Sequence, residues 1–223
     1  DLLAEHEVAT TAEQVLLTHG SSQALDLAAR RLVRAGDPVL VDEPGYANLL
    51  SSLRFLRARL IGAPRTPQGW DLDVLEARIK EHRPKVFFTH PRLQSPTAST
   101  AHLSHLHRVL QLAEKYDFVV VENDIYLDLD PQPRPSLASL DQLQRVVYIS
   151  SFSKTISPNI RVGYVVASAL RAVLAQRGPE LLIGLLVEHQ MVVAEMRSAD
   201  VPVEVLGLHI KREHVCEQRV ERS

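Results

Sequence analysis

A lysine set among small hydroxyl residues is the strongest candidate for chemistry in this sequence. Lys154 lies in the run Ser151-Phe152-Ser153-Lys154-Thr155, directly after an apolar stretch that is typical of a buried strand. A lysine amine held beside such a strand can be kept from water, which frees it to attack a carbonyl compound and form a Schiff base. Arg161 follows a few residues later and could bind an anion near the same point. The alternative is a solvated loop lysine, and Lys154 by itself does not exclude it.

A second candidate is an anion site at the start of a helix. The run Thr18-His19-Gly20-Ser21-Ser22-Gln23 joins the apolar residues 15–17 to a helix that we predict over residues 22–34. The free N–H groups and the positive dipole end of a helix favour a phosphate at its N-terminus. Ser21 and Ser22 could add hydroxyl donors. The alternative is a serine that only caps the helix.

Two further polar motifs come at the ends of apolar runs. Val121-Glu122-Asn123-Asp124-Ile125-Tyr126 ends one run, and Val41-Asp42-Glu43-Pro44-Gly45-Tyr46 ends another. In open α/β sheets, ligands bind in the crevice beyond the carboxyl ends of the strands. An aromatic side chain such as Tyr46 could stack on a planar ligand there. The structural alternatives are an Asx-rich turn for the first motif and a core-capping tyrosine for the second.

Short apolar runs alternate with helical patterns along most of the chain, which predicts an α/β fold with a mainly parallel sheet flanked by helices. We predict strands at residues 38–42, 58–62, 85–89, 118–121, 145–150 and 162–166, and helices at 22–34, 46–57, from 71 onward, and at 102–115. The pattern changes after residue 167, where residues 179–197 and 203–222 are helical in character.

Composition excludes several classes of protein. The 223 residues are 45% hydrophobic and carry a net charge of −2, so no basic surface indicates direct nucleic-acid binding. No apolar run is long enough to cross a membrane. The single cysteine, Cys216, excludes an internal disulfide and fits a reducing cytoplasm. The acidic start at Asp1, without methionine, is unlike a signal peptide, and we expect a fragment or a processed product.

The order of these motifs resembles the class I and II aminotransferases of fold type I over residues 12–167. The shared elements are GSSQ, DEPGY, RLQSPTA, ENDIY and SFSKT followed by Arg161. Longer phrases resemble the branch fused to GntR-type regulators, the MocR family: GSSQALDLAARRLV, GDPVLVDEPGY, LLQLAEKYDFVVVENDIY and YISSFSKTISPNIRVGY.

The resemblance implies pyridoxal 5′-phosphate (PLP) as the cofactor, joined to Lys154 as a Schiff base. It further implies that the cofactor phosphate is bound by Ser21, Ser22, Ser151 and Arg161. Tyr46 would stack on the pyridine ring, and Tyr126 and Ser95 would contact the phenolic oxygen. It divides the chain into a PLP-binding large domain, residues 1–167, and a helical segment, residues 168–223, that leads to an incomplete small domain. It also implies a cytoplasmic homodimer that takes an amino-acid substrate or effector.

The sequence departs from the family pattern at several positions. Asn123 stands where the family has the aspartate that pairs with the pyridine nitrogen, and an amide cannot hold that nitrogen protonated. Asp124 follows, and along a strand it would point to the opposite face, although a shift in register could still present it. We therefore expect that PLP binds but that transamination is slow or absent unless Asp124 substitutes. Ser95 replaces an asparagine and Ala98 a glycine. No residue after 178 matches the arginine that grips the substrate carboxylate.

Three functions remain open. The first is transamination of an amino acid, with Lys154 also acting as the general base. The second is an effector-sensing domain of a MocR/GntR-type regulator with little turnover, which would reach DNA only through a module outside this sequence. The third is a decayed relative that binds no PLP. A metal site at His102 and His105 is a weaker alternative to ordinary helix packing, so we expect no metal.

Overall fold

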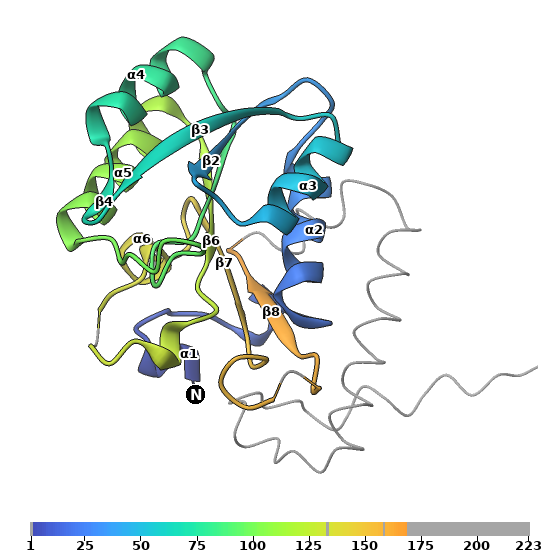
Figure 1. Ribbon diagram of the computed structural model, residues 1–223. Coiled ribbons are helices and arrows are strands. Elements are labelled where there is room, and N and C mark those ends of the chain that lie inside the picture. Colours follow the sequence, from blue (N-terminus) through green and yellow to red (C-terminus); the bar gives the residue numbers. More distant parts are fainter. Residues whose placement is uncertain (1, 133, 158, 169–223) are drawn as a thin grey trace, which may run out of the picture.

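The structure is a computed structural model that describes residues 2–132, 134–157 and 159–168. A mixed eight-stranded sheet in these residues lies between two layers of helices (Figure 1). The helices are α1 (Leu2–Glu5), η1 (Ala12–Gln14), α2 (Gly20–Leu32), α3 (Ala47–Phe55), α4 (Leu72–His82), α5 (Leu103–Tyr116), η2 (Leu127–Leu129) and α6 (Leu137–Asp141). The strands are β1 (Val15–Thr18), β2 (Pro38–Glu43), β3 (Arg59–Thr66), β4 (Gly69–Trp70), β5 (Val86–Thr89), β6 (Val119–Asn123), β7 (Val146–Ser151) and β8 (Gly163–Val166).

The strands follow the order β1-β8-β7-β6-β5-β2-β3-β4. The five strands from β7 to β3 are parallel to one another, whereas β8 is antiparallel to β7, β1 to β8, and β4 to β3. The predicted α/β fold with a mainly parallel sheet is therefore confirmed. Because of these directions, β1 and the parallel strands end at the same edge of the sheet, and β8 begins there. The predicted functional motifs meet at this carboxyl edge.

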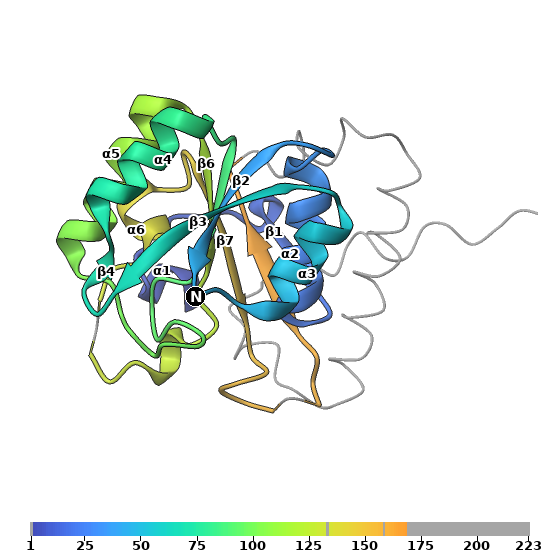
Figure 2. The same cartoon turned by 45° about the horizontal axis from the view of Figure 1, so that its top comes forward.

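Each face of the sheet has its own hydrophobic core. Helices α4, α5 and α6 cover one face and α2 and α3 cover the other, as Figure 2 shows most clearly. Neighbouring side chains of β5 alternate between the two cores: Phe87 packs under α5, and Phe88 packs under α2 and α3. Burial on both faces explains why the strands are continuous apolar runs rather than alternating ones.

The long helices begin and end for local reasons. The Asp71 side chain accepts a hydrogen bond from the Val74 N–H at 3.1 Å and caps α4. Helix α5 places Leu106, Val109 and Leu112 on one buried stripe and ends at Asp117, which adopts the left-handed conformation. The helices and strands predicted within the described residues are all present, with boundaries displaced by a few residues.

The short helices α1, α6, η1 and η2 and the two-residue strand β4 were not predicted, because helices of three to five residues and a strand of two are too short to show a hydrophobic period. Trp70 in β4 is fully buried, and its Nε1 donates to Asp42 Oδ1 at 2.8 Å. The helical segments predicted at 179–197 and 203–222 lie outside the described residues, so the division at residue 167 stays a prediction.

Two expected absences can be checked on the described residues only. No helix in that part of the chain is long and apolar enough to span a bilayer. The rings of His102 and His105 lie 6.3 Å apart, and no group of three metal-ligating side chains occurs among the described residues.

Candidate functional site

Two glycines bring the start of α2 against the start of β8. Gly163, the first residue of β8, pairs with Thr18 of β1 and with Ser151 of β7. A Cβ atom on Gly163 would lie 2.5 Å from the Gly20 carbonyl carbon and 2.8 Å from the Ser21 nitrogen. No other residue fits at Gly163 without moving the backbone, so the first turn of α2 packs directly on this strand end.

Arg161 lies over the same helix terminus. Its Nη2 donates to the His19 carbonyl oxygen at 3.2 Å, and a Cβ atom on Gly20 would lie 3.3 Å from that nitrogen. Arg161 has a φ of 52°, a left-handed conformation that is costly for a residue with a side chain. Such backbone strain concentrates at functional sites. Because the Arg161 guanidinium lies at the N-terminus of α2, its charge adds to the positive end of the helix dipole.

The two serines lie in the first turn of α2 rather than before it. Helix α2 begins at Gly20, its N-cap residue is His19, and no side-chain hydrogen bond from this residue caps the helix. The alternative in which a serine caps this helix is therefore wrong. Ser21 is half-buried and Ser22 is exposed. The first-turn N–H groups of a helix have no intrahelical acceptor, which leaves them to a ligand or to water.

Ser151 ends β7 beside this turn, and Lys154 follows in the loop that leads to β8. The buried Ser151 hydroxyl accepts a hydrogen bond from the Ser153 N–H at 3.1 Å. Lys154 is exposed and forms no hydrogen bond or ion pair within the described part of the chain. The sequence suggested a lysine kept from water. The described residues do not provide that burial, because the loop between β7 and β8 extends beyond the sheet edge (Figure 1).

Asn123 carries a buried polar atom that has no partner. It is the last residue of β6, opposite Ile149 of β7, and is 5% exposed. Its Oδ1 atom is buried and accepts no hydrogen bond from any described residue. In an Asx turn this oxygen would accept a backbone N–H, so Asn123 does not form the Asx turn that the sequence offered as an alternative. An unsatisfied buried acceptor is costly and rare in native proteins, so it indicates a missing donor, such as a ligand or a water.

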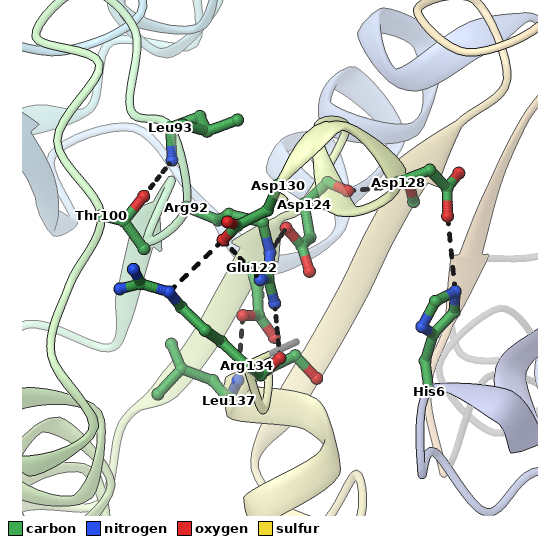
Figure 3. A network of polar contacts seen from close by, with 12 residues as sticks. His6, Arg92, Leu93, Thr100, Glu122, Asp124, Asp128, Asp130, Arg134 and Leu137 are labelled. Atoms are coloured by element: carbon green, nitrogen blue, oxygen red, sulfur yellow. Dashed lines mark hydrogen bonds and ion pairs between the residues drawn. The ribbon is translucent and has the colours of Figure 1, made fainter. Parts of the chain in front are cut away.

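Asp124 takes part in a buried ion-pair network (Figure 3) on the face of the sheet where Tyr148 packs, since the Tyr148 hydroxyl donates to Asp124 Oδ2 at 3.5 Å. Arg92 Nε donates to Asp124 Oδ1 at 2.9 Å, and Arg92 Nη1 donates to Asp130 Oδ2 at 3.0 Å. Burial raises the pKa of Asp124 and Arg92 opposes that shift. Because Asp124 is held by Arg92 on the opposite face, it cannot take the place of the family aspartate at Asn123. No local pattern in the chain indicated Arg92 as its partner.

His90 is a residue at this edge that sequence reasoning missed. It follows β5, is 4% exposed, and its ring stacks on Tyr126 with centroids 5.3 Å apart and planes at 16°. The Ser95 N–H donates to His90 Nδ1 at 3.3 Å. The imidazole thus joins two of the predicted cofactor contacts, Tyr126 and Ser95. A single histidine after an apolar run carries no signal by which sequence alone could have found it.

Tyr46 lies on the neighbouring loop. It is half-buried, packs against the core under α2 and α3, and its hydroxyl accepts a hydrogen bond from Asn48 Nδ2 at 3.0 Å. Gln94 ties this loop to the Ser95 loop, because its Nε2 donates to the Pro44 carbonyl oxygen at 2.7 Å. The contacts thus link Arg161 to the α2 terminus and Ser95 to Tyr126. Among the described residues, the side chains of Tyr46 and Lys154 make no hydrogen bond to either group, although Gln94 ties the loop of Tyr46 to the loop of Ser95.

Comparison with known proteins assigns the family. The sequence profile described as aminotransferase class I and II matches residues 1–200, and the chain belongs to this family. It is 36% identical over 193 residues to a 2-aminoadipate transaminase of Thermus thermophilus, covering 82% of this chain and 48% of the relative. It is 33% identical over 191 residues to the probable rhizopine catabolism regulatory protein MocR of Rhizobium meliloti, covering 82% of this chain and 38% of the relative.

A solved structure gives the same fold. The α-aminoadipate aminotransferase LysN of Thermus thermophilus, crystallised with N-(5′-phosphopyridoxyl)-L-leucine, superposes with a TM-score of 0.67 and 35% identity. The match covers 84% of this chain and 45% of that one. The chain thus spans less than half the length of each of these relatives, which include both transaminases and a regulator.

Proposed function

We propose that this chain binds PLP at the carboxyl edge of its sheet, with Lys154 as the point of covalent attachment, and that the complete protein transaminates an amino acid. The observation that carries the proposal is the Arg161 guanidinium at the N-terminus of α2, where its Nη2 donates to the His19 carbonyl oxygen at 3.2 Å. A cation, a helix dipole and first-turn N–H groups together suit a phosphate dianion.

The residues at this edge fit the remaining parts of PLP. A planar ring needs an aromatic face, its phenolic oxygen needs donors, and its nitrogen needs a polar partner. Asn123, a buried amide at the end of β6, is a polar side chain that can meet the ring nitrogen. We assign phosphate binding to Ser21, Ser22, Ser151 and Arg161, ring stacking to Tyr46, the phenolic oxygen to Tyr126 and Ser95, and the ring nitrogen to Asn123.

The chain's own residues would have three tasks in the reaction. Bound PLP supplies an electron-withdrawing ring that stabilises negative charge on the substrate Cα. Lys154 Nζ would first hold the cofactor and then, once released, take the proton from that Cα as general base. Arg161 would fix the phosphate. Asn123, as a neutral amide, would leave the ring nitrogen without a compensating charge, and the reaction would therefore be slow.

Borohydride trapping tests the attachment. The full 223-residue chain is incubated with PLP, reduced with borohydride, digested and examined by mass spectrometry. We expect a pyridoxyl group on the peptide that contains Lys154, and its loss in Lys154→Ala. A matched control is Lys115→Ala, a surface lysine on α5 that pairs with Glu76. Labelling that is spread over several surface lysines, or unchanged in Lys154→Ala, would overturn the proposal.

Asn123 and Asp124 support a second function, which is PLP-dependent sensing of an amino compound in a MocR/GntR-type regulator. Asp124 is committed to Arg92, so no carboxylate is left for the ring nitrogen. A sensor needs binding and a change of state but no turnover. The test is the half-reaction with amino acids in the parent and in Asn123→Asp. A slow parent accelerated by the aspartate supports sensing, whereas a fast parent unaffected by it supports transamination alone.

The finer points of organisation belong to the same proposal. Residues 1–167 would form the PLP-binding large domain, residues 168–223 would lead to a small domain, and the protein would act as a cytoplasmic homodimer. The exposure of Lys154 and Arg161 supports this assembly, because a second subunit could then cover the site. Light scattering on the purified protein with PLP measures the mass, and a monomer would contradict the dimer.

A further inference from the structure

Two buried polar atoms at neighbouring strand ends of the carboxyl edge have no hydrogen-bond partner among the described residues. One is Asn123 Oδ1, and the other is His90 Nε2. Thr89 and Glu122 are paired across β5 and β6, and His90 and Asn123 each follow one residue later. Asn123 follows Val121 by two residues on β6, and Val121 packs with Phe88 in the core under α2 and α3, so Asn123 lies on that face of the sheet. His90 is the first residue after the neighbouring strand end.

The contacts of His90 decide which of its nitrogens carries the proton. Its Nδ1 accepts the Ser95 N–H, so this nitrogen is unprotonated and the ring proton is on Nε2. Burial, with a further contribution from Arg65, lowers the pKa of His90 to about 4, which keeps the ring neutral at physiological pH. The atom without a partner is therefore a donor, and the atom without a partner on Asn123 is an acceptor.

The His90 ring is fixed from several sides. Tyr126 stacks on its face, the Ser95 N–H holds Nδ1, and the His90 backbone N–H donates to Asp42 Oδ2 at 2.8 Å. A donor held this firmly loses little conformational freedom when it binds an acceptor, and a neutral donor left unsatisfied in the interior is costly. The complementary unsatisfied acceptor at the adjacent strand end is Asn123 Oδ1.

We propose that His90 is a positioning residue whose Nε2–H donates to Asn123 Oδ1 through one bridging water, and so turns the amide NH₂ of Asn123 toward the cofactor. This inference rests on the proposed function and deepens it. An amide that offers N–H groups binds an acceptor, so the site selects PLP with a neutral, unprotonated ring nitrogen. A carboxylate at this position would select the protonated ring instead.

A double-mutant cycle tests the coupling. The dissociation constant for PLP is measured by equilibrium dialysis for the parent, His90→Phe, Asn123→Ala and the double variant. Phenylalanine keeps the stack on Tyr126 but has no donor, and loss of one neutral hydrogen bond weakens binding roughly fivefold. We expect that loss in the parent background and none in the Asn123→Ala background. An equal loss in both backgrounds, or no loss in either, overturns the proposal.

Two further variants separate positioning from packing. Gln has an amide nitrogen near the place of Nε2, so His90→Gln should restore binding to within about twofold of the parent. His105→Phe removes a histidine on α5, which covers the other face of the sheet, and should leave PLP affinity unchanged. If His90→Gln binds as poorly as His90→Phe, the donor is not what matters and the inference fails.

The state of the ring nitrogen provides a readout that does not depend on the His90 variants folding. With PLP labelled at the ring nitrogen by ¹⁵N, NMR distinguishes a neutral from a protonated pyridine. We expect a neutral nitrogen in the parent and a protonated one in Asn123→Asp. A protonated nitrogen in the parent overturns this inference and leaves the Lys154 attachment intact, whereas failure of borohydride trapping at Lys154 overturns the proposed function itself.

Discussion

Replacement of Arg92 should destabilise the protein more than any surface ion pair could. The Arg92 side chain is 5% exposed and joins three segments: it donates to Asp124 Oδ1, to Asp130 Oδ2 and to the Arg134 carbonyl oxygen, each within 3.0 Å (Figure 3). Arg92→Met keeps an unbranched apolar stem but removes all three bonds. Asp124, whose side chain is 1% exposed, is then left as an uncompensated buried charge. Breaking a buried pair in this way costs about 3–5 kcal/mol.

Urea unfolding followed by circular dichroism measures this loss of free energy. Arg30→Met is the matched control, because Arg30 pairs with Asp26 on the exposed surface of α2 and should cost less than about 1 kcal/mol. Adding Asp124→Asn to Arg92→Met should recover part of the loss by removing the unpaired charge. The reasoning is refuted if Arg92→Met lies within about 1 kcal/mol of the parent, or if Asp124→Asn makes the variant still less stable.

Two further predictions concern stability. Ala98 has a φ of 57°, where a side chain is strained, so Ala98→Gly should raise the free energy of unfolding by about 0.5–1 kcal/mol after the entropy of the unfolded glycine is counted. Denaturant titration checks this, and a loss of stability would contradict it. Burial raises the pKa of Glu122 to about 8 from 4.5, against hydrogen bonds from the Leu137 and Ala138 N–H groups. The folded state thus binds this proton more tightly, and the associated stability, complete below pH 4.5, is lost as pH rises to about 8. Unfolding of the parent and of Glu122→Gln across that range should show a steeper decline in the parent, and identical slopes would exclude Glu122 as the cause.

Local sequence patterns were enough to predict the class of fold and the edge at which the motifs gather. Apolar runs such as Val86–Thr89 are buried on both faces, and that double burial is recorded directly in their composition. The motif around Lys154 and the motif around Gly20 could be placed at one edge, because parallel strands end together. Short elements such as α6 escaped prediction, since their formation depends on partners far along the chain, here Glu122.

The details of the site were decided by tertiary contacts between distant residues. The sequence left open whether Asp124 could substitute for an aspartate at position 123, and the ion pair with Arg92 across the sheet decided that it does not. Local patterns also assigned no role to His90, because its stacking on Tyr126 and its unsatisfied Nε2 exist only when β5 and β6 lie side by side. Periodicity and turn chemistry act between near neighbours in the chain, whereas the direction and pairing of a polar side chain depend on what the folded sheet brings opposite it.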